Sequence, residues 1–345
     1  MNTDQRIDEL IAGMRAASAP GTDEPVVLMD TASQGDENEF LFFLKPELTD
    51  VAGSKAAPEV LNLVLSKIAG CGLEPFAIRV LPSGYLAKHK LLEQHYGVIN
   101  RLAHDPRTAL TASSRATFEQ HYGVPLEQAN VLGGFEFLAR FPEYTSATLD
   151  KLWMAEKSTK LGAGTYCRPV QAQGETVYLI NGFHPSQIEH YTKPGRSIVV
   201  FALRGPLNWS KARNELVGAT DPSRAQPESI RGTLLARSVA LGIGEISQAV
   251  NGVHLSAGPV EGLIELGRYL LDQEALRSSL QWIGRYSFGR ALQASFEPAE
   301  ISAILANVTV PWSGSSQSIY ELTEEKEPRD AILLLESVRS DLRQA

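Results

Sequence analysis

The spacing of apolar and polar positions predicts a helix, a loop and a buried strand in the first fifty residues. Residues 1–20 are mostly polar, with apolar side chains at helical spacing, which predicts a short amphipathic helix. These apolar residues are Ile7, Leu10, Ile11 and Met14. The polar stretch 31–39 then ends at the aromatic run 40–44, which is too short for a helix and typical of a buried strand.

The same spacing predicts further elements along the chain. Pro58 can open a helix with one apolar face, and the Gly70–Gly72 stretch "GCG" can close it. A second strand follows at 75–82 and a second helix at 84–97. Further strands are predicted at 176–182 and 197–205, a helix after Gly258, and helical segments in the C-terminal tail.

This order of elements indicates an α+β fold. Strands and helices alternate up to residue 97, strands return after a mixed region, and a helix follows His254. An antiparallel sheet with helices packed on one face accommodates that order. We therefore expect an α/β sandwich built on an antiparallel sheet.

Composition and charge restrict the classes of function. Of the 345 residues, 43% are hydrophobic and 21% charged, as in ordinary globular proteins. The net charge of −8 argues against a general nucleic-acid binder but leaves room for local basic sites. Cys71 and Cys167 form no CxxC pair, and we see neither a signal peptide nor a membrane-spanning run. We expect a cytoplasmic protein with no membrane partner.

Polar residues at the ends of the predicted elements form a set suited to phosphate chemistry. Lys and Arg supply positive charge, Thr and Asn supply hydrogen bonds, and a histidine can act as a nucleophile. The set consists of Lys45, Tyr96, Arg213, Thr220, Arg231, Asn251, His254, Ser256 and Glu265.

Each member also has a plainer interpretation. A lone histidine is usually a satisfied structural residue, and "VNGVHLSAG" around His254 has no second histidine or cysteine. Lys45 at a strand end suits an ordinary solvated lysine, and Arg231 a surface ion-pair partner. A solvated helix face would explain Glu265.

Several segments together resemble the nucleoside diphosphate kinase family. "RNELVGATDPSRAQPESIRG", followed by "NGVHLS", resembles its Arg, G-x-T-x-P, T-I-R-G and N-x-x-H-G-S-D motifs. "FLFFLKPEL" is similar to the family's first strand with its K-P-D motif, "LLEQHYG" to its H-Y helix, and "SIYE" to its W-I-Y-E ending. The resemblance implies a ferredoxin-like core and leaves almost half of the chain unmatched.

The resemblance also implies a division of the chain. The kinase core would consist of two parts, separated by an insertion and flanked by two extensions. The ranges are an N-terminal extension 1–38, a first core part 39–97, an insertion 98–175, a second core part 176–271 and a helical C-terminal extension 272–345.

The resemblance assigns catalytic roles to three residues. His254 matches the histidine that takes the γ-phosphoryl group, a step that needs an unprotonated ring nitrogen. Glu265 matches the glutamate that hydrogen-bonds the other ring nitrogen. Lys45 matches the lysine near the sugar hydroxyl and phosphate.

The remaining matches concern nucleotide and phosphate binding. Thr220 and Arg231 match the phosphate-binding pair, and Asn251 matches the residue that contacts the sugar. Ser256 matches the serine after the histidine, and Tyr96 the helix tyrosine near it. Arg213 matches a phosphate-binding arginine.

The implied reaction is a ping-pong phosphoryl transfer from a nucleoside triphosphate to a nucleoside diphosphate. The resemblance implies Mg²⁺, bound with the triphosphate, whose phosphates supply most of its ligands, so no metal site made of protein alone is expected. A homo-oligomer is possible. Two alternatives stay open: transfer to another small molecule, and a nucleotide-binding module without turnover.

The sequence departs from the family pattern near the histidine. Leu255 replaces a glycine and Ala257 an aspartate, and we expect the bulk of Leu255 to reshape the pocket. Arg213 lies one residue too far from the G-x-T motif, and Asn214 takes its place. Either a one-residue bulge restores Arg213, or a phosphate contact has weakened.

Two departures concern chain length. The stretch from Arg231 to Asn251 is longer than in the family, and the insertion 98–175 replaces a short region that includes an aromatic platform for the base. Phe183 and Tyr178 are both candidates for that platform.

Overall fold

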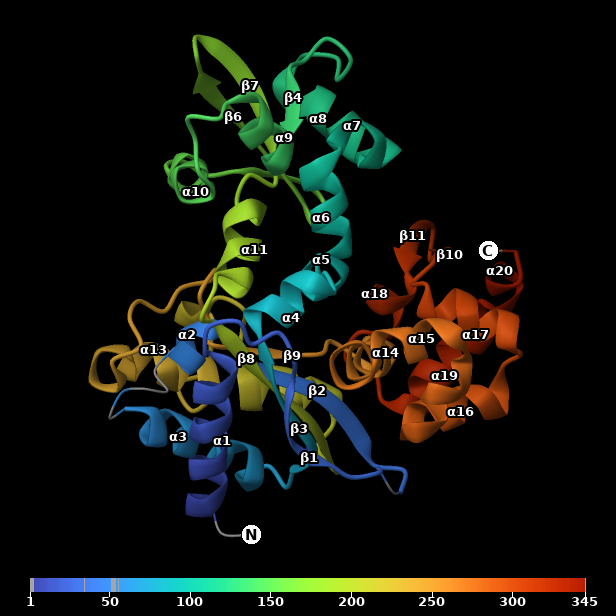
Figure 1. The fold of residues 1–345 in the computed structure, drawn as a ribbon. Coiled ribbons are helices and arrows are strands. Elements are labelled where there is room, and N and C mark those ends of the chain that lie inside the picture. The colour runs from blue at the N-terminus through green and yellow to red at the C-terminus, as the bar shows by residue number, and fades with distance from the viewer. Residues whose placement is uncertain (1–2, 34, 51–53, 55, 345) are drawn as a thin grey trace. The chain divides into compact units, whose positions relative to one another are not determined.

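The chain divides into two compact units. The computed structural model describes residues 3–33, 35–50, 54 and 56–344. The first unit consists of 1–89 and 194–345, and the second of 90–193 (Figure 1). The expected insertion 98–175 lies within the second unit, which also includes 90–97 and 176–193.

The first unit is built on a five-stranded antiparallel sheet, which confirms the α+β class. Its order is β1-β3-β8-β2-β9, and each neighbouring pair is antiparallel. The strands are β1 (Val26–Asp30), β2 (Asn38–Leu44), β3 (Glu74–Pro82), β8 (Ser197–Gly205) and β9 (Val253–Leu255). The strands expected at 40–44, 75–82 and 197–205 are therefore present.

The central strands have long apolar runs because both faces of the sheet are covered. Phe42 packs with helices α1 (Thr3–Ala17) and α3 (Ala57–Gly70) in one core. On the opposite face, the Phe43 ring lies 5.6 Å from that of Tyr269 in α14 (Pro259–Leu270). Alternate residues of one strand thus enter two different layers.

Short helices link and extend this sheet, and the C-terminal tail is largely helical, as expected (Figure 1). The linking elements are α2 (Pro46–Thr49), α4 (Ser83–Lys88), α12 (Trp209–Lys211), η2 (Ala212–Val217), η3 (Pro222–Arg224) and α13 (Ile230–Leu241). The tail contains α15 (Gln273–Ser278), η4 (Leu280–Arg285), α16 (Ser287–Ser295), α17 (Pro298–Leu305), α18 (Ile319–Thr323), α19 (Pro328–Ser337), α20 (Arg339–Leu342) and the hairpin β10 (Thr309–Trp312) and β11 (Ser315–Ser318).

The second unit has its own sheet and its own cores. Strands β4 (Val131–Gly133), β5 (Thr159–Gly162), β6 (Thr165–Ala172) and β7 (Glu175–Ile180) pair in the order β4-β7-β6-β5, with β4 and β7 parallel. One core surrounds Phe118 and another Phe137. The helices are α5 (Leu91–His95), α6 (Gly97–His104), α7 (Pro106–Ala109), α8 (Ala112–Tyr122), α9 (Gly134–Arg140), α10 (Ser146–Met154) and α11 (His184–Thr192).

The single helix predicted at 84–97 is wrong. Helix α4 ends at Lys88, and Lys90 adopts a left-handed backbone conformation with φ of 51° before α5 begins. An L-residue in that region interrupts the helical hydrogen-bond series. The break coincides with the boundary between the two units.

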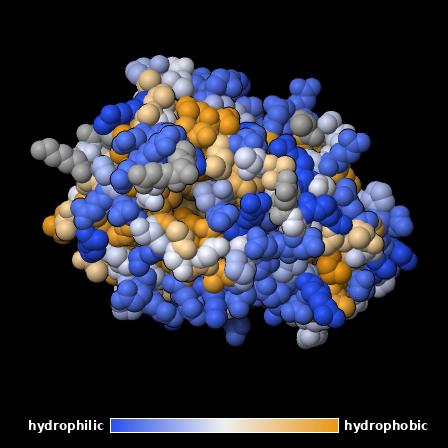
Figure 2. Space-filling model, turned by 90° about the horizontal axis from the view of Figure 1, so that it is seen from below, coloured by the Kyte–Doolittle hydropathy of each residue, from blue (hydrophilic) through white to orange (hydrophobic). Residues whose placement is uncertain are grey.

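Exposed apolar side chains are scattered over the surface. On the face seen in Figure 2, charged and polar areas separate the apolar ones. Among the described residues, no helix has both the length and the apolar character needed to cross a bilayer.

Candidate functional site

The site centres on His254, in the edge strand β9. Phe43 lies opposite His254 and Phe42 opposite Leu255 in the pairing with β2. Since side chains alternate along a strand, Leu255 packs into the core while the His254 ring stacks on Phe43, with centroids 4.6 Å apart. The expectation that Leu255 reshapes the pocket is therefore wrong, because its bulk lies on the opposite face of the strand.

A fully buried carboxylate holds one nitrogen of the imidazole. Glu265, on α14, lies 2.9 and 3.1 Å through its two oxygens from Nε2 of His254. Its side chain is 1% exposed, whereas that of His254 is 18% exposed, so the solvated-face interpretation of Glu265 is wrong. A carboxylate at Nε2 favours the tautomer that carries its proton there and a lone pair on Nδ1.

A second acid lies one helical turn before Glu265. Glu261 accepts a hydrogen bond from the Ala257 N–H (2.8 Å) through its carboxylate. Burial raises the pKa of Glu261 to about 7, with a further contribution from the negative charge of Glu265. The N–H of Ala257 and the side chains of Arg213 and Arg268 oppose that rise.

Lys45 and Asn251 join three separate segments of the chain. The Lys45 N–H donates to the Gly252 carbonyl (2.9 Å), and its Nζ donates to Oδ1 of Asn251 (2.7 Å). The amide of Asn251 in turn donates to the carbonyl of Thr220 (3.0 Å). The end of β2, the G-x-T segment and the approach to β9 are thus brought together.

Arg231 makes a second link between the same segments. It lies in the first turn of α13, which Ser229 caps through a hydrogen bond from the Gly232 N–H. Its guanidinium donates to the carbonyls of Gly218 (2.8 Å) and Val253 (2.9 Å). The second of these carbonyls directly precedes His254.

Lys45 and Arg231 are two buried cations close enough to influence one another. They are 8% and 9% exposed, so the interpretations of a solvated lysine and a surface ion pair are both wrong. Burial lowers the pKa of Lys45 to about 8; the carboxylate of Glu47 opposes this and the charge of Arg231 adds to it. Two such charges make a favourable place for a polyanion.

Gly252 makes the close approach of these segments possible. Its φ is +84°, and a Cβ there would lie 2.6 Å from Cδ1 of Leu234. Its N–H donates to Oε1 of Glu47 (2.7 Å). A larger residue would meet both the backbone penalty and the clash.

Arg213 lies in a π-helical turn that absorbs one extra residue. The Gly218 N–H donates to the Arg213 carbonyl five residues earlier (2.9 Å), within η2. The bulge that would bring Arg213 back into place is therefore present. Its guanidinium pairs with Glu324 (3.0 Å) and Glu325 (3.2 Å) of the C-terminal extension.

Two other predicted residues of the first unit have different surroundings. The Ser256 hydroxyl is buried, accepting from the Leu41 N–H (3.0 Å) and donating to the Leu41 carbonyl (3.1 Å), so it joins β2 to the end of β9. Thr220 is exposed, and its carbonyl accepts the hydrogen bond from Asn251.

Tyr96 and both platform candidates lie in the second unit. The Tyr96 hydroxyl is 3.5 Å from that of Tyr191, and its ring meets the edge of His184. Tyr178 packs with the core around Phe118, and Phe183 with the core around Phe137. Their contacts within that unit are structural.

Sequence reasoning missed Phe43, Glu47 and Glu261. The four-residue spacing of Glu261 and Glu265 places both on one helix face, and that spacing is readable in the sequence. The stacking of Phe43 on His254 depends on strand register, and the link from Glu47 to Gly252 on a contact 205 residues apart. Neither leaves a local signal.

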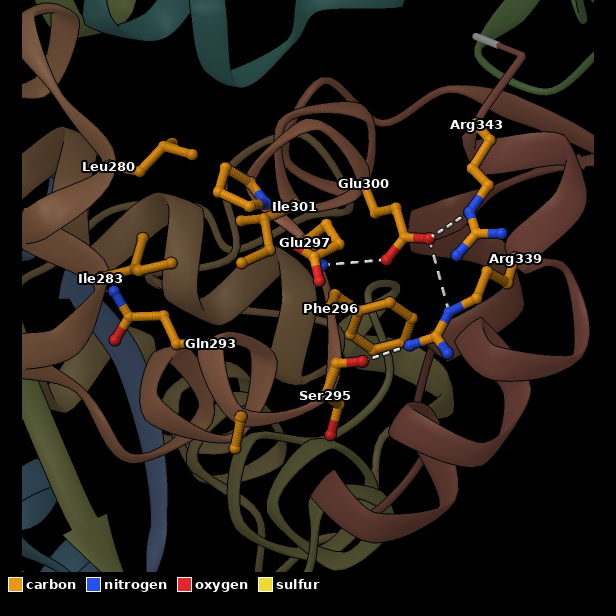
Figure 3. Close-up of a pocket in the computed structure, with 12 residues that line it drawn as sticks. Leu280, Ile283, Gln293, Ser295, Phe296, Glu297, Glu300, Ile301, Arg339 and Arg343 are labelled. Atoms are coloured by element: carbon orange, nitrogen blue, oxygen red, sulfur yellow. Dashed lines mark hydrogen bonds and ion pairs between the residues drawn. The ribbon is translucent and has the colours of Figure 1, made fainter.

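A cavity of about 350 Å³ lies elsewhere in the first unit, among the C-terminal helices (Figure 3). Arg343 bonds Glu300 there (2.7 Å), and Arg339 donates to the Ser295 carbonyl and lies over the Phe296 ring. These polar groups thus form their hydrogen bonds and contacts with other residues of the C-terminal helices. The residues around His254 do not line this cavity.

Comparison with protein-family models and with curated proteins found no match for this chain. The chemistry of the site therefore has to be argued from its geometry. That geometry combines an imidazole, a buried carboxylate that contacts one of its nitrogens, and two buried cations.

Proposed function

We propose that the protein is a nucleoside diphosphate kinase-like phosphotransferase that works through a phosphohistidine at His254. The contact between Glu265 and Nε2 of His254 carries this proposal. A buried carboxylate on one ring nitrogen directs the lone pair of the other towards a substrate and stabilises positive charge that develops on the ring.

The first step transfers the γ-phosphoryl group of a nucleoside triphosphate to Nδ1. The lone pair of Nδ1 attacks phosphorus, the bond from phosphorus to the β–γ bridging oxygen breaks, and the nucleoside diphosphate leaves with that electron pair. Lys45 and Arg231 stabilise charge on the phosphate oxygens. In the second step an acceptor nucleoside diphosphate attacks the phosphohistidine and regenerates His254.

The donor groups of the site suit a triphosphate that brings its own metal. Lys45 and Arg231 are N–H donors with positive charge, which match phosphate oxygens rather than a bare cation. Bound with the triphosphate, Mg²⁺ would neutralise part of the phosphate charge. The residues described here would hold the phosphates and orient the histidine.

The arrangement of the sheet supports a ferredoxin-like core. The order β2, α3, β3, then β8, α13, β9 repeats the β-α-β-β-α-β pattern of that fold, with β8 between β2 and β3. In this proposal the second unit is an insertion between the two halves, and β1 is an added edge strand.

The direct test is phosphoryl transfer without an acceptor. Incubation with γ-labelled ATP and Mg²⁺ should give acid-labile, base-stable label that is lost in His254→Gln. Glu265→Gln should be labelled on the order of a hundredfold more slowly, because the neutral amide stabilises the charged ring less.

The exposed His121, in the second unit, offers a matched control: His121→Gln should be labelled like the natural protein. Label that survives in His254→Gln would overturn the assignment of the nucleophile. Discharge by nucleoside diphosphates, but not by other small molecules, would identify the acceptor. ATP binding without any label would instead favour a nucleotide-binding module.

A further inference from the structure

A short segment of the C-terminal extension reaches back to the residues that follow His254. Residues Thr323–Glu327, here called the strap, connect α18 to α19. The Glu325 N–H donates to the carbonyl of Ala257, three residues after His254 (2.9 Å). Glu327 accepts from the Trp209 N–H (2.9 Å) and from the Asn38 side chain (2.8 Å), which fixes the far end of the strap.

The carboxylates of the strap converge on the π-helical turn. Glu324 and Glu325 pair with Arg213, and Glu325 also accepts from the Asn214 amide (3.3 Å) and the Ser210 hydroxyl (3.1 Å). Arg213 thus meets two negative charges, and the turn that carries it ends at Gly218, whose carbonyl accepts from the site residue Arg231. The positive charge of Arg213 is more than offset there.

Local backbone features fit the strap to this position. Glu325 has a φ of 55°, a left-handed conformation that costs about 1 kcal/mol or more for a residue with a side chain. A Cβ at Gly258 would lie 2.5 Å from the carbonyl oxygen of Thr323, so only a glycine lets the strap approach. The left-handed conformation of Glu325 is a cost that opposes its ion pair with Arg213.

We infer that the strap is an internal competitor for the phosphate site, and that a bound polyphosphate takes Arg213 away from Glu324 and Glu325. This inference rests on the proposed function for its biological ligand. Arg213, which the two carboxylates neutralise in the protein without ligand, would then pair with the phosphates. The strap would lose its ion pairs with Arg213. The C-terminal extension therefore sets the affinity of the site for nucleotide.

A binding experiment tests this without any chemistry at the histidine. Inorganic tripolyphosphate is titrated by calorimetry into the full-length His254→Gln protein and into the same protein with Glu325→Gln. Loss of one partly exposed ion pair should tighten binding by about threefold to fivefold. Glu336→Gln, which removes an exposed carboxylate from α19, should leave the affinity unchanged.

The specific role of Arg213 is tested by a double-mutant cycle. In an Arg213→Gln background, Glu325→Gln should give no gain in affinity for tripolyphosphate. The reason is that the strap carboxylates and the tripolyphosphate then have no Arg213 to compete for. The inference is overturned if tripolyphosphate binds neither protein, if Glu325→Gln leaves affinity unchanged or weaker, or if the gain persists without Arg213. Labelling of His254 by ATP is measured separately, so failure of the proposed reaction is distinguishable from failure of the strap.

Discussion

At the scale of single residues, the site consists of charges that the fold buries at a cost. Lys45, Arg231 and Glu265 each lie where water is excluded, and each is held by hydrogen bonds to other segments. Burying a charge is unfavourable unless partners compensate it. Their joint burial around the strand that carries His254 is the observation on which the proposed reaction rests.

The cost of burying the Glu261 carboxylate can be measured through the pH dependence of stability. Its folded pKa of about 7 lies above the ordinary value, so the folded state binds more protons between about pH 4.5 and 7 and stability falls as pH rises through that window. Glu261→Gln should therefore raise the free energy of unfolding of the first unit at pH 8, by about 1 to 3 kcal/mol.

At about pH 3 the same variant should match the natural protein, because Glu261 is then protonated in the unfolded as well as the folded state. Urea unfolding at the two pH values gives the comparison, with Glu336→Gln as an exposed control. An equal effect at both pH values would show that Glu261 is not held at a raised pKa.

At the scale of elements, the approach to β9 depends on one glycine. Gly252→Ala should lower the free energy of unfolding by about 2 to 4 kcal/mol, the sum of a left-handed backbone penalty and a clash with Leu234. Gly242→Ala, with a similar φ of +61° but open space around it, isolates the backbone penalty and should cost about 1 kcal/mol. Chemical denaturation measures both; equal losses would refute the clash.

Helices and strands were predictable where the residues of the segment itself indicate them. The runs at 40–44 and 198–203 are apolar throughout because both of their faces are buried, and the sequence displays that directly. The helix break at Lys90 was not predictable, since a lysine, unlike a glycine or an asparagine, gives no indication of a left-handed backbone conformation. The only sign of the π-helical turn in the sequence is one extra residue between Arg213 and the G-x-T motif. The partners of Ser256 and Arg213 were not predictable, because they lie in distant segments of the chain.

At the scale of the whole molecule, the division into units could not be inferred from the local pattern. The segment 175–180 is a strand as expected, yet it pairs within the second unit rather than with the main sheet. A strand signal predicts the element and not its partner, because pairing depends on residues far away in sequence. The expected boundaries 98 and 175 followed the resemblance alone.

The second unit should fold by itself. Residues 90–193, expressed as a fragment, should unfold cooperatively because the unit contains its own sheet and cores. Burial lowers the pKa of His184 to about 4, so the fragment should lose stability as pH falls from about 6.5 towards 4, where the unfolded state binds the extra proton. Circular dichroism against temperature and pH tests both; a non-cooperative fragment would contradict the division.

The most direct test of the central claim is the position of the phosphoryl group on the labelled protein. Since Glu265 contacts Nε2, the account predicts that ³¹P NMR of the protein after reaction with ATP shows a phosphohistidine substituted at Nδ1 of His254. A phosphoryl group on Nε2, on another residue, or on none would contradict it.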